Sequence, residues 1–337
     1  GWTPRRTIIL ASWDAGEDGS IGSTEWIEEN LERLRLRGVA YINLDNAVNG
    51  DYSLAAAGSP LLAKAVYQAS MDVNCPDESH ADMNVYQDWV LRRPMGGAIS
   101  RPRVDPLGQT SDAAPFLMLA GVPSVDLQYT YDEDLYAVPR YPTSQTVADD
   151  SQNILQFIDG DFAVHVALTE VVVRTVVTLA DSPQLTMDLT HYADSLSSYL
   201  QDFKAQYGST LTNRTISLGR LEAAVRDFAT AARAFQTNFD STDETDALKL
   251  REMNDHVLSV ERAFLLNEWI PANPESRHVV YGASPSAVYK GAPFGLLAQM
   301  IAIQTDVGDW GIVDQTLGLT TLALQAATGI LKDGQLH

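Results

Sequence analysis

The spacing of hydrophobic residues changes once along the chain and divides it in two. Before about residue 182, short apolar runs alternate with amphipathic segments, and after it apolar residues recur every three or four positions. Alternating strand and helix signals are typical of an α/β domain, whereas the longer spacing is typical of helices that bury one face. We therefore expect part of an α/β domain over residues 1–182 and an all-α helical bundle over residues 183–337.

The first half predicts strands and helices in turn. TIILAS (7–12) and VAYINLD (39–45) are apolar runs typical of buried strands, and a helix is expected between them at 23–37, with its N-cap at Ser23 or Thr24. This order predicts a βαβ unit with parallel strands. A helix at 59–70, a helix end, turn and strand within 116–130, and a buried helix at 162–180 that closes the domain are also expected. His165 in that last helix is expected to be a core histidine with its hydrogen bonds satisfied.

The second half predicts a bundle. Apolar stripes cover 185–203, 218–235, 250–264 and 313–331, and helices with such stripes pack together in antiparallel bundles. Residues 241–244 fit a capping box for the third helix. The segment 267–294 is rich in Pro, Gly and Ser and predicts a long loop, a kind of segment that is often functional.

Composition narrows the classes of partner. The formal net charge of -21 disfavours nucleic acid and anionic membrane surfaces, because phosphate groups would be repelled. Cys75 is the single cysteine, which excludes a disulfide within the chain and a cysteine-based zinc site. We expect no segment long and apolar enough to span a membrane. Asn213-Arg214-Thr215 is an N-glycosylation sequon, which predicts a glycoprotein only weakly.

Acidic residues follow two of the predicted strands. Asp14, Glu17 and Asp18 come after 7–12, and Asp45 ends 39–45. Ligands gather at the carboxyl ends of strands in an open α/β sheet, and divalent cations bind carboxylate oxygens there. The pattern is compatible with the edge of a metal site and also with solvated loop residues.

Several motifs resemble one known family. GW-PRR, ASWDA, GSTEW and RGVAYIN near the start, PFLMLAGVPSVDL and RYP further on, and MNDHVLSVERAFL (253–265) with RHVVYG (277–282) resemble the glutamate carboxypeptidase II and transferrin receptor family of M28 zinc-peptidase-like proteins. The resemblance covers nearly the whole chain. It implies the C-terminal half of a peptidase-like domain followed by a helical dimerisation domain, with the rest of the family's architecture expected upstream.

The resemblance also implies roles for individual positions. Active members carry two consecutive glutamates, a general base and then a zinc ligand, where this sequence has Gly16 and Glu17. Asp45 matches a second zinc ligand, and Gln145 stands where the family has a ligand histidine. Glycine cannot move a proton, and an amide is a poorer zinc ligand than imidazole. Glu17 and Asp45 are therefore expected to be vestigial metal candidates, and no catalytic residue is expected.

The substrate side of the family pattern is altered as well. Where glutamate-specific members hold a substrate carboxylate with a Lys-Tyr pair, this chain has Val288 and Tyr289, and Lys290 is out of register. Tyr289 is the one residue expected from this pattern in a substrate pocket. Arg277 and His278 are expected to make structural hydrogen bonds.

We therefore expect a catalytically inactive, peptidase-like homodimer with an interaction or receptor-like role, formed through its helical domain and without a cofactor. The alternative is a zinc-dependent carboxypeptidase or aminopeptidase with altered metal ligands, and a third reading is a stable remnant without activity of its own. The expected partners are a second copy, the upstream half of the same polypeptide and an unknown protein or peptide ligand. The resemblance places the parent protein as a type II membrane protein whose ectodomain lies in the vacuolar or secretory pathway or at the cell surface, with this chain itself soluble.

Overall fold

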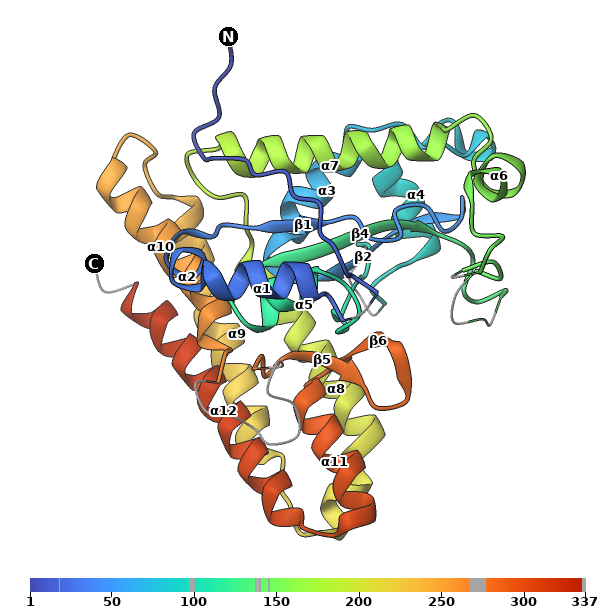
Figure 1. The fold of residues 1–337 in the computed structure, drawn as a ribbon. Coiled ribbons are helices and arrows are strands. Elements are labelled where there is room, and N and C mark those ends of the chain that lie inside the picture. The colour runs from blue at the N-terminus through green and yellow to red at the C-terminus, as the bar shows by residue number, and fades with distance from the viewer. Residues whose placement is uncertain are drawn as a thin grey trace.

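The computed structural model, shown in Figure 1, has an α/β domain that packs against one end of a helical bundle. It describes residues 1–17, 19–96, 101–136, 138, 141–144, 146–266 and 277–334, without the side chains of 287–289. One continuous hydrophobic core runs from the sheet into the bundle. The predicted fold class is therefore confirmed.

A mixed sheet lies at the centre of the first domain. Its strands are β1 (Tyr41–Asn43), β2 (Ser53–Gly58), β3 (Val104–Asp105) and β4 (Ser124–Thr130), in the order β1-β4-β2-β3. Strand β4 runs parallel to β1 and antiparallel to β2, which is parallel to β3. Alternate residues of β4 face opposite sides of the sheet: Leu127 and Tyr129 are buried in the core, and Asp126 and Gln128 lie on the other face.

Helices cover both faces of the sheet, as Figure 1 shows. On one side lie α3 (Ala63–Met71), α4 (Val85–Arg92) and α7 (Ala163–Asp181), and on the other lie α1 (Ile21–Glu29) and α5 (Ala113–Met118). The shorter elements are α2 (Leu31–Arg37), α6 (Ser151–Asn153), the 3₁₀ turns Pro60–Leu62 and Glu78–His80, and a π-helical turn at Ile154–Ile158. The helix predicted at 59–70 and the helix end, turn and strand predicted within 116–130 are confirmed.

The strand predicted at residues 7–12 is absent. This segment has no strand partner among the described residues, and Ile9 and Leu10 are 59% and 94% exposed. A strand forms only where a neighbour accepts its backbone hydrogen bonds, and apolar composition cannot supply that neighbour. The predicted βαβ unit is therefore wrong, and the parallel partner of β1 is β4.

The helix predicted at 23–37 is two helices that meet at Asn30. Asn30 has a backbone ψ of 12°, and its side-chain amide donates to the carbonyl of Trp26 at 2.9 Å. The first helix begins after Ser20, whose backbone is left-handed, and not after Ser23 or Thr24 as expected. Gly38 ends the second helix, as its place after the apolar pattern indicates.

Helix α7 is confirmed as a helix but is buried on one face only. Val166 and Val173 on its outer face are 56% and 53% exposed. By length and composition alone this helix would be able to cross a membrane, and the sequence-based expectation of no such segment is therefore wrong. In the structure, 39% of its apolar stretch is buried within the molecule. Apolar content alone does not tell which face of a helix packs. His165 is also outside the core: its side chain is 32% exposed, and its Nδ1 lies 2.5 Å from a carboxylate oxygen of Asp159.

The bundle contains α8 (Leu189–Asn213), α9 (Gly219–Asp240), α10 (Ala247–Ala263), α11 (Gly295–Val307) and α12 (Trp310–Asp333). The apolar stripes correctly predict α8, α9, α10 and α12, whereas α11 was missed because nearly all of its residues are uncharged and no stripe stands out. Helix α10 is capped by Asp246, which accepts from the backbone N–H of Lys249 at 3.0 Å, and not by residues 241–244.

The segment predicted as a long loop contains a β-hairpin instead. Strands β5 (Tyr281–Ser284) and β6 (Ala287–Pro293) pair antiparallel; residues 267–276 lie outside the described part of the chain. Glycines allow close backbone contacts here. A Cβ atom on Gly291 would lie 2.2 Å from the carbonyl oxygen of Pro106, and one on Gly295 would lie 2.5 Å from the Cα of Gly282. The hairpin therefore packs tightly on both the α/β domain and α11.

A fully buried carboxylate joins the two domains. Glu261 on α10 accepts hydrogen bonds from the hydroxyl of Ser59, which follows β2, and from the hydroxyl of Tyr192 on α8 at 2.8 Å. His278 Nδ1 accepts the backbone N–H of Val280 at 3.1 Å, so its Nε2 carries the proton and donates to Glu261 at 3.0 Å. The structural role expected for His278 is therefore confirmed.

Candidate functional site

A pocket of about 240 Å³ opens on the face of the sheet away from α3 and α7. Strand β2 forms its floor. Ala55 and Ala57 pair with Gln128 and Asp126, so their small methyl side chains face the pocket and leave room above the sheet, whereas Ala56 faces the core. The loop after β1, strands β3 and β4, the turn before α5 and the β5–β6 hairpin supply its walls. The pocket therefore draws residues from both domains.

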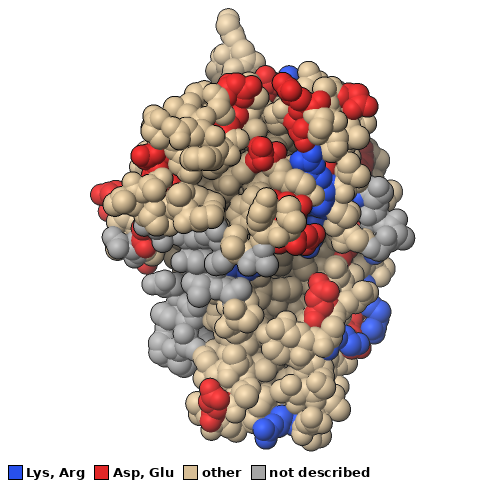
Figure 2. Space-filling model, turned by 90° about the vertical axis from the view of Figure 1, so that its right-hand side faces the viewer, with Lys and Arg blue, Asp and Glu red and all other residues tan. Residues whose placement is uncertain are grey.

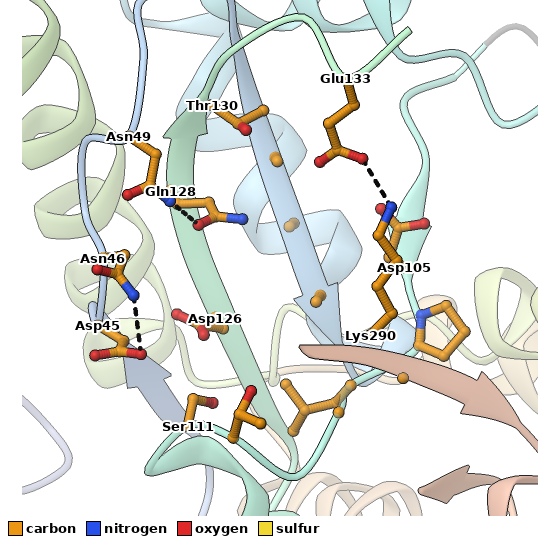
Figure 3. Close-up of a pocket in the computed structure, with 18 of the residues that line it drawn as sticks. Asp45, Asn46, Asn49, Asp105, Ser111, Asp126, Gln128, Thr130, Glu133 and Lys290 are labelled. Atoms are coloured by element: carbon orange, nitrogen blue, oxygen red, sulfur yellow. Dashed lines mark hydrogen bonds and ion pairs between the residues drawn. The ribbon is translucent and has the colours of Figure 1, made fainter. Parts of the chain in front are cut away.

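One wall, shown in Figure 3, carries carboxylates and amides. We call it the acid–amide wall and define it as Asp45, Asn46, Asn49, Ser111, Asp126 and Gln128. Asn46 donates to the carboxylate of Asp45 at 3.4 Å, and Asn49 donates to the side-chain oxygen of Gln128 at 2.8 Å. These paired amides fix the side chains around Asp126.

A chain of hydrogen bonds connects Asp126 to Trp13, which lies at the start of the acidic segment that contains Asp14, Gly16 and Glu17. Trp13 Nε1 donates to the hydroxyl of Tyr41 at 3.0 Å, and this hydroxyl donates to Asn43 Oδ1 at 2.8 Å. Asn43 then donates through Nδ2 to Asp126 Oδ1 at 3.2 Å. Because β1 and β4 are parallel with Asn43 opposite Asp126, the sheet itself aligns the last two residues.

Asp126 of this wall and Tyr41 of the hydrogen-bond chain that leads to it have shifted pKa values. Burial raises the pKa of Asp126 to about 6, the hydrogen bond from Asn43 acts against this rise, and the charge of Asp45 adds to it. Burial also raises the pKa of Tyr41 to about 12. The hydrogen bond from Trp13 lowers this pKa, and the negative charges of nearby carboxylates raise it. Asp126 is half-buried and Asp45 is exposed, so the wall is acidic and partly desolvated.

The opposite wall is a closed network of ion pairs. Arg93 contacts Asp105 at 3.1 Å and Glu133 at 3.5 Å, Arg103 contacts Asp105 at 2.7 Å, and Lys290 contacts Glu133 at 3.1 Å. Burial tends to raise the pKa of Glu133, but Arg93 and Lys290 outweigh it and hold that pKa below its ordinary value. The cations of the pocket are therefore already matched by carboxylates of the same wall.

The structure separates the acids that the sequence grouped together. Asp45 lies in the pocket, whereas Gly16 and Glu17 are exposed and do not line it. The nearest atom to a Cβ placed on Gly16 would be Asp112 Oδ2, at 3.8 Å. Asp112 accepts a hydrogen bond of 2.5 Å from Ser23 at the start of α1. The turn therefore lies beside the pocket's rim, next to the residue that follows Ser111.

The remaining predicted positions lie outside the described residues. These are Asp18, Gln145, and the side chains of Val288 and Tyr289, whereas Lys290 is described and lines the pocket. Across the described ranges, no three His, Cys, Asp or Glu side chains are placed to share a metal ion. A zinc site would thus need ligands beyond this part of the chain, so the described residues alone do not fit zinc.

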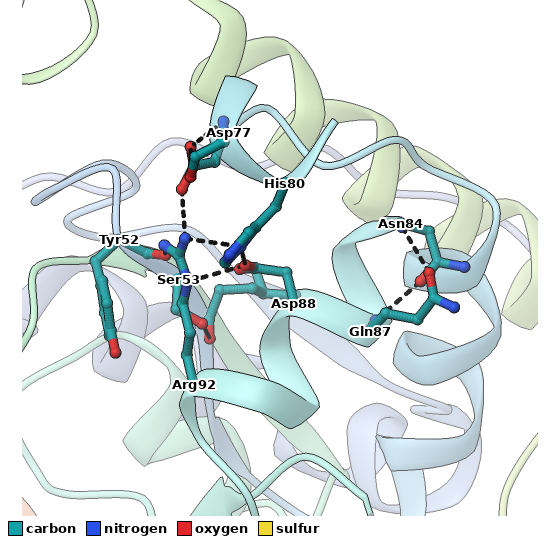
Figure 4. A network of polar contacts seen from close by, with 10 residues as sticks. Tyr52, Ser53, Asp77, His80, Asn84, Gln87, Asp88 and Arg92 are labelled. Carbon is teal, nitrogen blue, oxygen red and sulfur yellow. Dashed lines mark hydrogen bonds and ion pairs between the residues drawn. The ribbon is translucent and has the colours of Figure 1, made fainter. Parts of the chain in front are cut away.

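A second polar cluster lies between α4 and the first residues of β2, as Figure 4 shows. Asp88 is buried and contacts His80 Nδ1 at 2.6 Å and Arg92 Nε at 2.9 Å, while Arg92 also pairs with Asp77 and donates to the carbonyl of Tyr52. Burial raises the pKa of Asp88 despite these partners. Each charge in the cluster has a partner, so we interpret it as structural.

The surface is acidic in keeping with the net charge of -21. On the face seen in Figure 2, Asp and Glu side chains are spread over the upper part of the molecule, with a compact group of Lys and Arg side chains among them. No extended basic area is visible on that face.

Comparison with known proteins matches both halves of this architecture. Residues 1–156 match peptidase family M28, and residues 216–332 match the transferrin receptor-like dimerisation domain. The chain is a member of the M28 peptidase-like proteins that carry a transferrin receptor-like dimerisation domain. The resemblance seen in the motifs is confirmed.

Relatives of this M28-type chain bear enzyme names. It is 33% identical to the aminopeptidase NAALADL1 of Rattus norvegicus over 98% of its own length and 45% of the relative's. It is also 33% identical to two probable glutamate carboxypeptidases of Arabidopsis thaliana, LAMP1 over 87% of the chain and 40% of the relative, and AMP1 over 99% and 45%. The chain therefore spans less than half the length of the relatives it matches.

Sequence reasoning missed most of the pocket. Asp126, Gln128, Asp105, Glu133 and Arg93 were not singled out, although all line it. The available signal was the alternation in SVDLQYT, where charged and polar residues occupy every second position of a strand that was expected to be buried. A carboxylate at such a position usually has a partner or a function.

Proposed function

We propose that this M28-type chain supplies the ligand pocket and the dimer contacts of a homodimeric protein that binds a peptide or protein ligand without hydrolysing it. The observation that carries the proposal is Gly16. It stands where active members of the family have the general base, and among the described side chains near it Asp112 is already hydrogen-bonded to Ser23. Loss of a general base reduces hydrolysis by about 10²- to 10⁴-fold.

The test is hydrolysis by the full-length protein and by Gly16→Glu. We expect wild type to give no hydrolysis of aminoacyl or acyl-dipeptide reporters above background with zinc added. A Cβ fits at Gly16, since its nearest contact would be 3.8 Å, so Gly16→Glu tests whether a base alone is missing, with Gly16→Gln as the matched control. Zinc-dependent turnover by wild type would contradict the proposal.

The second candidate is a zinc-dependent exopeptidase. Its support is that the relatives are named as an aminopeptidase and as probable glutamate carboxypeptidases, while the chain spans only 40% to 45% of them. Ligands and a base supplied by other parts of the polypeptide would complete the site. Metal analysis of the full-length protein separates the candidates: bound zinc together with turnover favours the exopeptidase.

We also propose that the parent protein is a type II membrane glycoprotein of the secretory pathway, vacuole or cell surface. Asn213 of the sequon is exposed at the C-terminal end of α8, where an oligosaccharide transferase would reach it. Enzymatic deglycosylation of protein from the native source should lower its mass, and Asn213→Gln should make that change smaller. An unaltered mass in wild type would contradict this part of the proposal.

A further inference from the structure

We propose that the acid–amide wall binds a primary ammonium group, with the Asp126 carboxylate as its counter-charge and the Ser111 hydroxyl as a second acceptor. The inference rests on the proposed function, namely that this pocket is the ligand site, and it names the chemistry of the ligand. The positive group would be the α-ammonium of a peptide or the ε-ammonium of a lysine side chain.

The charges of the pocket are segregated in a way that favours a cation at Asp126. Every Lys and Arg that lines it lies on the ion-pair wall and contacts Asp105 or Glu133. Within the described part of the chain, no Lys or Arg forms an ion pair with Asp126, and its hydrogen bonds come from uncharged groups: the amide of Asn43, the hydroxyl of Ser111 and the backbone N–H of Asp45. A carboxylate in such a desolvated place gains from a bound cation.

Ser111 supplies an independent observation. Its side chain is 8% exposed and lines the same pocket, and its hydroxyl donates towards the Asp126 carboxylate, while no group among the described residues donates a hydrogen bond to its oxygen. Figure 3 shows it beside Asp126 on the acid–amide wall. A buried hydroxyl oxygen that accepts no hydrogen bond is unfavourable, because it has lost the hydrogen bonds that water would donate to it.

One ligand group satisfies both residues. A carboxylate only accepts hydrogen bonds, and an ammonium group offers three N–H donors, so it can bind Asp126 and the hydroxyl oxygen of Ser111 together. A carboxylate ligand at this wall would meet the charges of Asp126 and Asp45 and be repelled. The wall therefore selects a donor that carries positive charge.

The experiment measures binding of four peptides to the full-length protein by calorimetry. Ala-Ala-amide carries an α-ammonium, Nα-acetyl-lysyl-alanine amide carries an ε-ammonium, Nα-acetyl-alanyl-alanine amide carries neither, and Nα-acetyl-glutamyl-alanine amide carries a carboxylate. We expect an ammonium peptide to bind at least about 10-fold more tightly than the neutral peptide, as for a hydrogen bond to a charged group. Whichever ammonium peptide binds more tightly identifies the source of the cation.

Two variants and a control test the residues. Asp126→Asn keeps the shape and the acceptor for Asn43 but removes the charge, so the ammonium preference should fall by about 10- to 100-fold, whereas Ser111→Ala should lower it by a smaller factor. Asp134→Asn removes one charge from an exposed position outside the pocket and should leave the preference unchanged. Thermal unfolding of each variant reports whether it is folded.

The outcomes separate this inference from the function on which it rests. Equal binding of the ammonium and neutral peptides by wild type overturns the ammonium inference without any variant, while the pocket remains a ligand site. An ammonium preference that Asp126→Asn leaves intact in a folded protein also overturns it. Binding of none of the four peptides, or of longer peptides, overturns the proposed function itself.

Discussion

Removal of the Glu261 carboxylate should destabilise both domains at once. Its side chain is fully buried and accepts from Ser59, Tyr192 and His278, which are themselves buried. Glu261→Ala would leave all three donors without an acceptor, at about 1–3 kcal/mol each before relaxation. Because part of this cost is recovered by relaxation, we expect the free energy of unfolding to fall by about 4 kcal/mol.

Urea unfolding followed by circular dichroism and tryptophan fluorescence measures this loss. Glu261→Gln keeps one acceptor oxygen and should cost about 1–3 kcal/mol. Glu252→Ala on the same helix is the matched control, because that side chain is 37% exposed and its ion pair with Lys249 contributes about 0–1 kcal/mol. A loss below about 1 kcal/mol for Glu261→Ala would refute the reasoning. A Ser59→Ala and Glu261→Gln double-mutant cycle should give a coupling of about 0.5–3 kcal/mol between the domains.

Four further predictions follow from other parts of the molecule. Gly295→Ala should destabilise the protein by about 1–3 kcal/mol, because its Cβ would lie 2.5 Å from the Cα of Gly282. Gly318→Ala in α12, where the Cβ would meet open space, should raise the melting temperature through helix propensity. Hydrogen bonds from Ser79 and Arg92 lower the pKa of Asp77 to about 2 from its ordinary value of about 3.9. The stability that Asp77 contributes is therefore complete above about pH 4 and is lost as the pH falls towards 2, so urea midpoints of wild type and Asp77→Asn should converge over that range; a constant difference would contradict this. Leu322 of α12 is 61% exposed within the dimerisation region, and Leu322→Lys should weaken the dimer by about 10- to 100-fold in light scattering or sedimentation if it lies in the interface; an unchanged dimer would exclude that face.

The helical half was largely predictable, because its signal is local. The spacing of Leu221, Val225, Phe228 and Phe235 alone specifies which face of α9 is buried, and all four side chains are buried in the structure. Helix α11 was missed for the same reason, since apolar residues such as Ile303 and Val307 also lie on its exposed face and obscure the periodicity. Its existence depends on packing against α12 and the hairpin.

The sheet half was less predictable, because strand pairing is not local. Residues 7–12 have the composition of a strand but no neighbour among the described residues, whereas β3 at Val104–Asp105 has little strand composition and pairs with β2. The pocket depends on the same pairings, which bring Asn43 opposite Asp126 and Ala57 opposite Asp105. Sequence motifs singled out Asp45, which lines the pocket, but the partners around it come from distant segments that no short motif contains.

The β5–β6 hairpin has a consequence for how this architecture is inherited and engineered. Lys290 and Gly291 come from the C-terminal part of the chain, yet they line a pocket whose other residues lie before residue 145. A chimera that took residues 1–156 from one relative and the remainder from another would therefore combine two unrelated sets of pocket residues. The unit that must be exchanged to transfer ligand preference is the α/β domain together with this hairpin, although the two are separated by more than a hundred residues of sequence.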